Sequence, residues 1–197
     1  MNAEFEYTGH FYELDSFKLR KYLDIKRAGV ILDDPDLMVV MMNPGSSLPL
    51  DGIDNNVIPS EARPDRTQDQ ITIVMDRLGF NYARILNLSD LRTPNSKELY
   101  RFLKSDISSK VEHSIFLPSR QSELKLYFVV DVPVIFGWGV DPALVPLARL
   151  AIQALCIRNP LGILKPKTKY SFYHPLQRGR ARQHWWVNSV ISQSPRT

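Results

Sequence analysis

The feature that most constrains the fold is a run of six apolar residues from Leu37 to Met42, without alternating polar positions. A strand with one face in water alternates, so this run predicts a strand buried on both faces, in a sheet covered by helices on both sides. The run ends abruptly at Asn43-Pro44-Gly45-Ser46-Ser47. The stretch from there to Arg63 is rich in Pro, Gly, Asn and Asp and predicts a long loop, which in a compact domain is usually functional or mobile.

Hydrophobic periodicity indicates the other elements. Alternation within residues 5–26 predicts a strand pair that caps an edge of the main sheet. Further strands are predicted by short apolar runs at residues 82–88, 132–136 and 169–173. Helices are predicted by apolar spacing and by capping residues at 65–78, 95–103, 119–129, 142–156 and 180–191.

Alternating strands and helices predict an α/β fold. We expect three layers, α/β/α, with a central, mostly parallel four-stranded sheet and an added N-terminal β-hairpin. No Gly/Ser-rich or repetitive stretch separates two units, so a single domain is expected over residues 1–197. Its N-terminal strand extension would cover residues 1–30 and its core residues 37–192.

Ligands of parallel sheets bind at the carboxyl ends of the strands. The four predicted strands end in polar or unusual residues, namely Asn43-Pro44-Gly45, Asn87, Gly137-Trp138-Gly139 and His174-Pro175. We therefore expect a site at this edge of the sheet.

Charge is unevenly distributed along the chain. Residues 142–197 contain nine Lys or Arg and no Asp or Glu, whereas residues 1–141 contain 16 basic and 21 acidic residues. Three arginines, Arg178, Arg180 and Arg182, follow the last predicted strand end. A positive rim of this kind favours a polyanionic partner. The alternative is a solvated helix face whose acidic partners lie elsewhere in the fold.

Several classes of protein are disfavoured. The single cysteine, Cys156, excludes an intramolecular disulfide, and no apolar run approaches the length of a membrane span. With no signal-like N-terminus either, we expect a cytoplasmic protein without membrane contact. The four histidines lack metal-ligand spacing, and no dinucleotide or phosphate-binding glycine motif occurs, so neither a metal nor a cofactor is expected. The oligomeric state is left open.

Taken in order, the four strand ends resemble the motifs of the uracil-DNA glycosylase superfamily, and the chain is also similar to a bacterial family of unknown function. Met41-Met42-Asn43-Pro44-Gly45 resembles the first motif and is closest to the Asn-Pro-Gly of the mismatch-specific branch. Ile85-Leu86-Asn87-Leu88 resembles the second, and Ile135-Phe136-Gly137-Trp138-Gly139 the third. His174-Pro175-Leu176 resembles the last motif but lacks the two residues that usually precede its wedge leucine.

The resemblance implies hydrolysis of an N-glycosidic bond, with a nucleic acid, DNA foremost, or a nucleotide as partner. The catalytic residues would be Asn43, orienting the attacking water, and His174, donating a hydrogen bond to the base as it becomes anionic. The base would be bound by Asn87 together with Pro44 and Gly45. The Asn87 amide offers the donor and acceptor pair that reads a base edge.

Phosphate or nucleic-acid contacts are assigned to Ser46, Ser47, Leu176, Arg178, Arg180 and Arg182. Each assignment has a structural alternative: Asn43 as a turn initiator, Asn87 as a loop cap and His174 as a histidine bonded to a backbone carbonyl. Two other functions also remain open. One is a non-catalytic nucleic-acid-binding module, and the other is an enzyme that acts on free nucleosides or nucleotides, which the short wedge loop favours.

Overall fold

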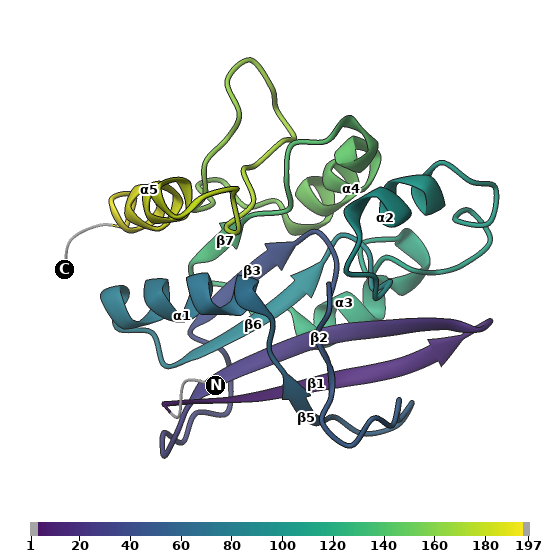
Figure 1. Ribbon diagram of the computed structural model, residues 1–197, viewed down its shortest axis with the longest axis horizontal. Coiled ribbons are helices and arrows are strands. Elements are labelled where there is room, and N and C mark those ends of the chain that lie inside the picture. The colour runs from purple at the N-terminus through teal and green to yellow at the C-terminus, as the bar shows by residue number, and fades with distance from the viewer. Residues whose placement is uncertain (1–3, 195–197) are drawn as a thin grey trace.

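A seven-stranded sheet runs through the computed structural model, which describes residues 4–194 (Figure 1). The strand order is β4-β5-β1-β2-β6-β3-β7. In chain order the strands are β1 (Phe5–Leu14), β2 (Phe17–Arg27), β3 (Leu37–Met41), β4 (Leu48–Pro49), β5 (Ser60–Arg63), β6 (Tyr82–Asn87) and β7 (Val134–Phe136). The pairs β6–β3 and β3–β7 are parallel, and the other pairs are antiparallel.

This sheet shows that the predicted fold class was wrong. The sheet is mixed and mostly antiparallel, not a mostly parallel four-stranded sheet. The N-terminal hairpin is not an addition at one edge, because β1 and β2 lie inside the sheet and β2 pairs with β6. The strand predicted at residues 169–173 does not form, and Phe172 makes only isolated bridges to Gly139 and Leu164. Periodicity identifies strand-like segments, but it does not determine their pairing.

Helices cover both faces of the sheet (Figure 1). One face carries α1 (Arg66–Leu78) and α5 (Arg180–Ile191), and the other carries α2 (Ser96–Leu103), α3 (Gln121–Tyr127) and α4 (Val145–Leu155). Short 3-10 turns, η1 (Pro118–Arg120) and η2 (Pro142–Leu144), precede α3 and α4.

Strand β3 is buried throughout, which explains its unbroken apolar sequence. Leu37, Val39 and Met41 pack in the core with α1 and α5. Met38 and Val40 pack in the core with α2, α3 and α4. Both faces of β3 therefore contribute to hydrophobic burial, and the polar residues that follow it are held at a fixed edge.

Helix α1 starts at a capping box that also shapes this edge. The Asp65 carboxylate accepts a hydrogen bond from the Thr67 backbone N–H at 2.7 Å, and the Gln68 side chain accepts one from the Asp65 backbone N–H. Such caps satisfy amides that the helix leaves unpaired. Asp65 also packs against the turn after β3, because a Cβ added to Gly45 would lie 2.6 Å from Asp65 Oδ2.

Candidate functional site

A cavity of about 240 Å³ lies at the carboxyl ends of β3 and β6. We name it the Asn87 cavity. Asn43, Asn87 and His174 all line it. Its other lining residues are Arg20, Met41, Met42, Gly45, Ser46, Asp65, Arg66, Thr67, Gln68, Ile85, Thr93, Pro94 and Leu176. Because a cavity of about 150 Å³ accommodates benzene, the Asn87 cavity has room for one heterocycle.

Asn87 is fully buried at the end of β6, in register with Met41 of β3. Neither its Oδ1 nor its Nδ2 forms a hydrogen bond with any described residue. A buried polar group without a partner costs about 1–3 kcal/mol. The amide therefore presents an unused donor and an unused acceptor to the cavity, as a base-reading residue requires.

Asn43 has a fixed amide orientation. Its Nδ2 donates hydrogen bonds to the carbonyl oxygens of Leu91 at 3.1 Å and Thr93 at 2.8 Å. Both amide protons are thereby used by the loop after β6, and Oδ1 is the group left to accept a hydrogen bond. An amide oxygen can orient a water molecule, although it cannot take up its proton.

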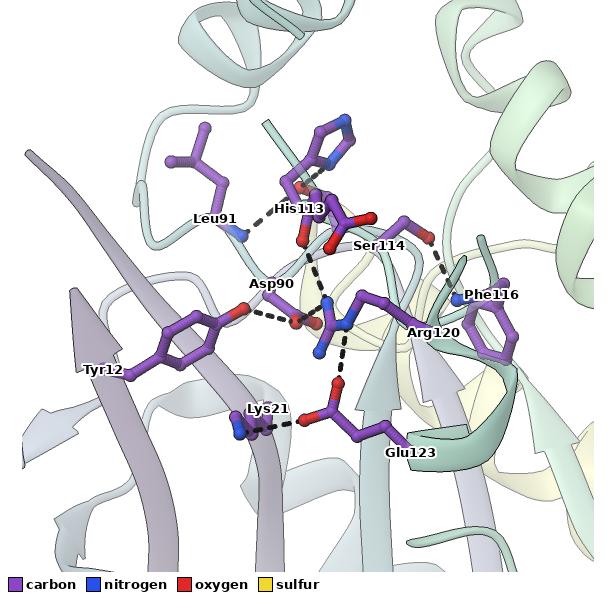
Figure 2. A network of polar contacts seen from close by, with 11 residues as sticks. Tyr12, Lys21, Asp90, Leu91, His113, Ser114, Phe116, Arg120 and Glu123 are labelled. Atoms are coloured by element: carbon purple, nitrogen blue, oxygen red, sulfur yellow. Dashed lines mark hydrogen bonds and ion pairs between the residues drawn. The ribbon is translucent and has the colours of Figure 1, made fainter. Parts of the chain in front are cut away.

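A buried polar network holds the loop that fixes Asn43 (Figure 2). Asp90 Oδ2 accepts hydrogen bonds from Tyr12 Oη at 2.9 Å and Arg120 Nη1 at 2.6 Å. Arg120 Nε also donates to Glu123 at 2.7 Å. Burial raises the pKa of Asp90 to about 6, even though Arg120 and Tyr12 stabilise the carboxylate. The network lies beside the cavity rather than in it, so its role is to position the loop.

Two tryptophans hold the segment that leads to His174. The Trp138 indole N–H donates to the Tyr170 carbonyl at 2.7 Å, and the Trp186 indole N–H donates to the Tyr173 carbonyl at 2.8 Å. Both indole rings are fully buried. Together with isolated backbone hydrogen bonds from Gly139 to Phe172 and from Tyr173 to Ile163, they fix the approach to His174 without a continuous strand.

The His174 ring is oriented by its own turn. Its Nδ1 accepts a hydrogen bond from the Leu176 backbone N–H at 3.1 Å, which puts the proton of the neutral ring on Nε2. Burial lowers the pKa of His174 to about 4, and the nearby Asp65 carboxylate opposes this shift. At neutral pH His174 is therefore an uncharged hydrogen-bond donor through Nε2.

Several cavity residues were missed as site residues by the sequence-based prediction, and two of them, Asp65 and Arg20, bear directly on its chemistry. Asp65 was recognised only as a helix cap, yet it adds a carboxylate to the Asn87 cavity. Arg20 was not assigned at all. It is 1% exposed, although strict alternation along the sequence would group it with Lys18 and Asp24, a polar pattern typical of a solvent-facing strand surface; in the structure a register shift between β1 and β2 breaks that alternation. The chain carries no local signal that this arginine is buried.

Other predicted site residues lie around the cavity or away from it. Gly45, Ser46 and Leu176 line it, and Leu176 is half-buried in the wall. Pro44 and Ser47 are buried behind the turn and do not line it, and Ser47 Oγ has no partner among the described residues. Three exposed arginines lie outside the cavity, namely Arg178, Arg180 and Arg182.

A second cavity, of about 490 Å³, adjoins the first. Met42, His174 and Leu176 line both cavities, and Trp138 and Tyr100 line only the second, which we name the Trp138 cavity. His174 therefore lies between the Asn87 cavity and the Trp138 cavity. A ligand larger than one ring has space to extend past the histidine.

Within residues 4–194, no helix is long and apolar enough to span a membrane, and no group of three or more His, Cys, Asp or Glu side chains is arranged to hold a metal ion. Comparison with known proteins yields no matching family model, no matching curated protein and no matching solved structure. The case for a functional site therefore depends on the geometry of the Asn87 cavity, and the similarity to the glycosylase superfamily stays a prediction.

Proposed function

We propose that the Asn87 cavity binds one nucleobase and that the protein hydrolyses the N-glycosidic bond joining this base to its sugar. The observation that carries the proposal is the Asn87 side chain, fully buried and without hydrogen-bond partners among residues 4–194, in a cavity also lined by Asn43 and His174. An amide kept unpaired in this position is suited to a ligand with a donor and an acceptor on one edge.

The reaction breaks the bond between C1′ of the sugar and a ring nitrogen of the base. The electron pair of that bond leaves with the base, and the oxygen of a water molecule bonds to C1′. Asn43 Oδ1 orients this water, and the Asp65 carboxylate takes up its proton. The same carboxylate stabilises the positive charge that develops on the sugar in the transition state.

His174 acts on the other product of bond cleavage. As the base departs it gains negative charge, and the Nε2–H of neutral His174 donates a hydrogen bond to it. A donor fixed in advance where charge develops contributes about 10²–10³-fold to the rate. The bond from Leu176 to Nδ1 provides this fixed orientation.

The basic C-terminal part of the chain supports a polynucleotide as substrate. Arg178 is exposed just before α5, Arg180 and Arg182 are exposed in its first turn, and residues 142–197 contain no acidic residue. Arginines in this setting can bind phosphates that flank the base in the cavity. The half-buried Leu176 and the short loop around it favour the competing substrate class, free nucleosides or nucleotides.

The test is release of a base from oligonucleotides carrying uracil, mismatches and modified bases, and from the corresponding nucleosides. Asn87→Ala and His174→Ala are each expected to reduce release about 100-fold or more. The matched controls Asn188→Ala and His184→Ala change exposed residues of α5 and are expected to retain it.

Substrate class is read from the same assay. Release from oligonucleotides that weakens steeply with salt supports a polynucleotide substrate, because phosphate contacts release counterions. Release only from nucleosides, unaffected by salt, would assign the protein to small-molecule hydrolysis. Oligonucleotide binding without release of any base would contradict the enzymatic proposal and favour a binding module.

A further inference from the structure

Arg20 is the most unusual charged residue of the Asn87 cavity. Its side chain lines the cavity and is almost completely buried, at 1% exposure. Neither Nε nor Nη1 has a hydrogen-bond partner, and Arg20 forms no ion pair with any of residues 4–194. A guanidinium has only donors, so these groups lack acceptors altogether.

Two other arginines with little solvent exposure, Arg84 in the sheet and Arg120 in η1, are paired. Arg84 of β6 binds Asp24 through Nε at 2.7 Å and Nη2 at 2.8 Å. Arg120 binds Asp90 and Glu123. An unpaired buried ion is strongly unfavourable, so buried arginines normally have such partners. Arg20 departs from this rule in the one place where a ligand can supply the missing acceptors.

Charged groups near Arg20 act on it only at a distance. Asp65 and Asp90 favour its protonated form, and Arg92 opposes it. Burial lowers the pKa of Arg20 to about 10, so the guanidinium still carries its charge at neutral pH. The cavity thus contains a fixed positive charge next to Asn87, which lies on the neighbouring strand of the sheet.

We propose that Arg20 is a catalytic residue that binds acceptor atoms of the heterocycle and stabilises the negative charge the base carries as it leaves. The catalytic role of Arg20 rests on the proposed function. Its role in binding requires only that the cavity holds a heterocycle. His174 and Arg20 then share the departing charge, His174 as a neutral donor and Arg20 as a cation. Rings with oxygen acceptors, and anionic rings above all, are the expected ligands.

Binding is tested with two free pyrimidine-type rings of similar shape, uracil, which is neutral at pH 7, and barbituric acid, which is anionic. Calorimetry is expected to show that the wild type binds barbiturate about tenfold to a hundredfold more tightly than uracil, because hydrogen bonds to charged groups are the stronger ones. Arg20→Met should abolish this preference, and Arg20→Lys should retain part of it. An unchanged preference in Arg20→Met would overturn the inference.

Thermal unfolding separates a ligand-binding role from a structural one. Arg20→Met removes an unpaired buried charge and is expected to raise Tm. Arg84→Met, the matched control, leaves Asp24 without its partner and is expected to lower Tm. If Arg20→Met lowered Tm as Arg84→Met does, Arg20 would be a structural residue and the inference would fail. If Arg20→Met does not fold, Arg20→Lys decides the matter, and an undiminished barbiturate preference in that variant would overturn the inference.

Turnover distinguishes failure of the inference from failure of the proposed function. In the wild type, the rate of base release should depend only weakly on the stability of the departing base anion. In Arg20→Met, the release of poor leaving groups should slow more than the release of good ones such as 5-fluorouracil. Base release with the same leaving-group dependence in both proteins would refute the catalytic role of Arg20 while leaving the function intact. Barbiturate binding that requires Arg20, without release of any base, would refute the function while supporting Arg20 as the anion-binding residue.

Discussion

At the scale of single residues, the Asn87 cavity contains polar groups that the fold itself does not satisfy. Asn87 and Arg20 are buried without hydrogen-bond partners for the atoms named above. Proteins retain such unfavourable groups mainly where function requires them, and replacing them often gains stability at the expense of activity. This relation between stability and binding can be measured directly at Asn87.

Asn87→Leu is expected to stabilise the protein and to remove base binding. Leucine has the same branched shape, its larger methyl groups can extend into the cavity, and it eliminates both unpaired polar atoms, so the free energy of unfolding should rise by about 1–3 kcal/mol. For a chain of this size that corresponds to an increase in Tm of roughly 2–4 °C per kcal/mol. Calorimetry with and without a free base measures both effects. A lower Tm would indicate that the amide is satisfied within the folded protein.

Asn43, Asn87 and His174 could be proposed from sequence because each stands directly after an apolar run, where a strand end exposes its next side chain. Arg20 and Asp65 could not be assigned in the same way. Arg20 lies within β2, and its burial results from contacts with elements far along the chain. The sequence explains Asp65 fully as the cap of α1, so no sequence feature indicates that it also lines the cavity.

At the scale of elements, the turn after β3 is shaped by contact with the start of α1. Gly45 adopts a left-handed conformation, with φ of 64°, and has no room for a Cβ on the side facing Asp65. The turn therefore couples the position of Asn43 to that of the Asp65 carboxylate. Other strand ends at this edge depend on similar close packing, since Gly137 has Pro175 Cδ 3.2 Å from its ideal Cβ position.

Gly45→Ala is expected to destabilise the protein and to impair base release. The left-handed backbone alone costs an alanine about 1–2 kcal/mol, and the new methyl must also displace Asp65. Gly52→Ala is the matched control, because Gly52 has φ of 75° but nothing within 4 Å of its added Cβ. Urea unfolding and base release are compared for both variants. Equal effects of the two substitutions would show that the contact with Asp65 is unimportant.

The existence of β3, β6 and α1 could be predicted because burial on both faces, short apolar runs and helix caps are local properties of a sequence. The position of the hairpin could not, since pairing of β2 with β6 joins segments about sixty residues apart, as Leu23 opposite Ile85 illustrates. The segment 169–173 has a strand-like composition, but it joins its neighbours through isolated bridges and the indole N–H groups of Trp138 and Trp186 instead of a continuous ladder.

At the scale of the whole molecule, the Asn87 cavity lies where two kinds of sheet meet. Strands β4, β5, β1 and β2 form an antiparallel part, and β6, β3 and β7 form a parallel part. Arg20 comes from the last strand of the first part and Asn87 from the first strand of the second. The parallel part supplies the strand ends that ligands commonly use in α/β proteins, and the antiparallel part adds the buried cation.

Stability is expected to fall between about pH 6.5 and pH 4. Burial lowers the pKa of His10, and it lowers those of His113 and His174 to about 4 from their usual 6.5. Their neutral forms favour the folded state above pH 6.5, and this advantage is lost as pH falls. Asp90 opposes the trend, because its pKa is raised and its protonation favours the folded state as pH falls through about 6. Urea unfolding from pH 7.5 to pH 4 checks the sign.

His113→Gln tests whether the histidines with lowered pKa cause the loss of stability at acid pH. It removes one of the three imidazoles whose pKa is lowered, at a site outside the Asn87 cavity. The variant is expected to lose less stability than the wild type between pH 6.5 and pH 4, at about 1.4 kcal/mol for each unit of pKa shift removed. An identical pH dependence in both proteins would mean that His113 titrates normally.

The segment that carries His174 is joined to its neighbours by isolated bridges, by single backbone hydrogen bonds such as the one from the Tyr173 N–H to the Ile163 carbonyl, and by the indole hydrogen bonds of Trp138 and Trp186. Such a segment can open while β3 stays paired with β6. Deuterium should therefore enter the Tyr173 amide sooner than the Val40 amide. A ring held in the Asn87 cavity would contact His174 and oppose this opening, so a bound ligand should slow deuterium entry at Tyr173 and leave Val40 unchanged.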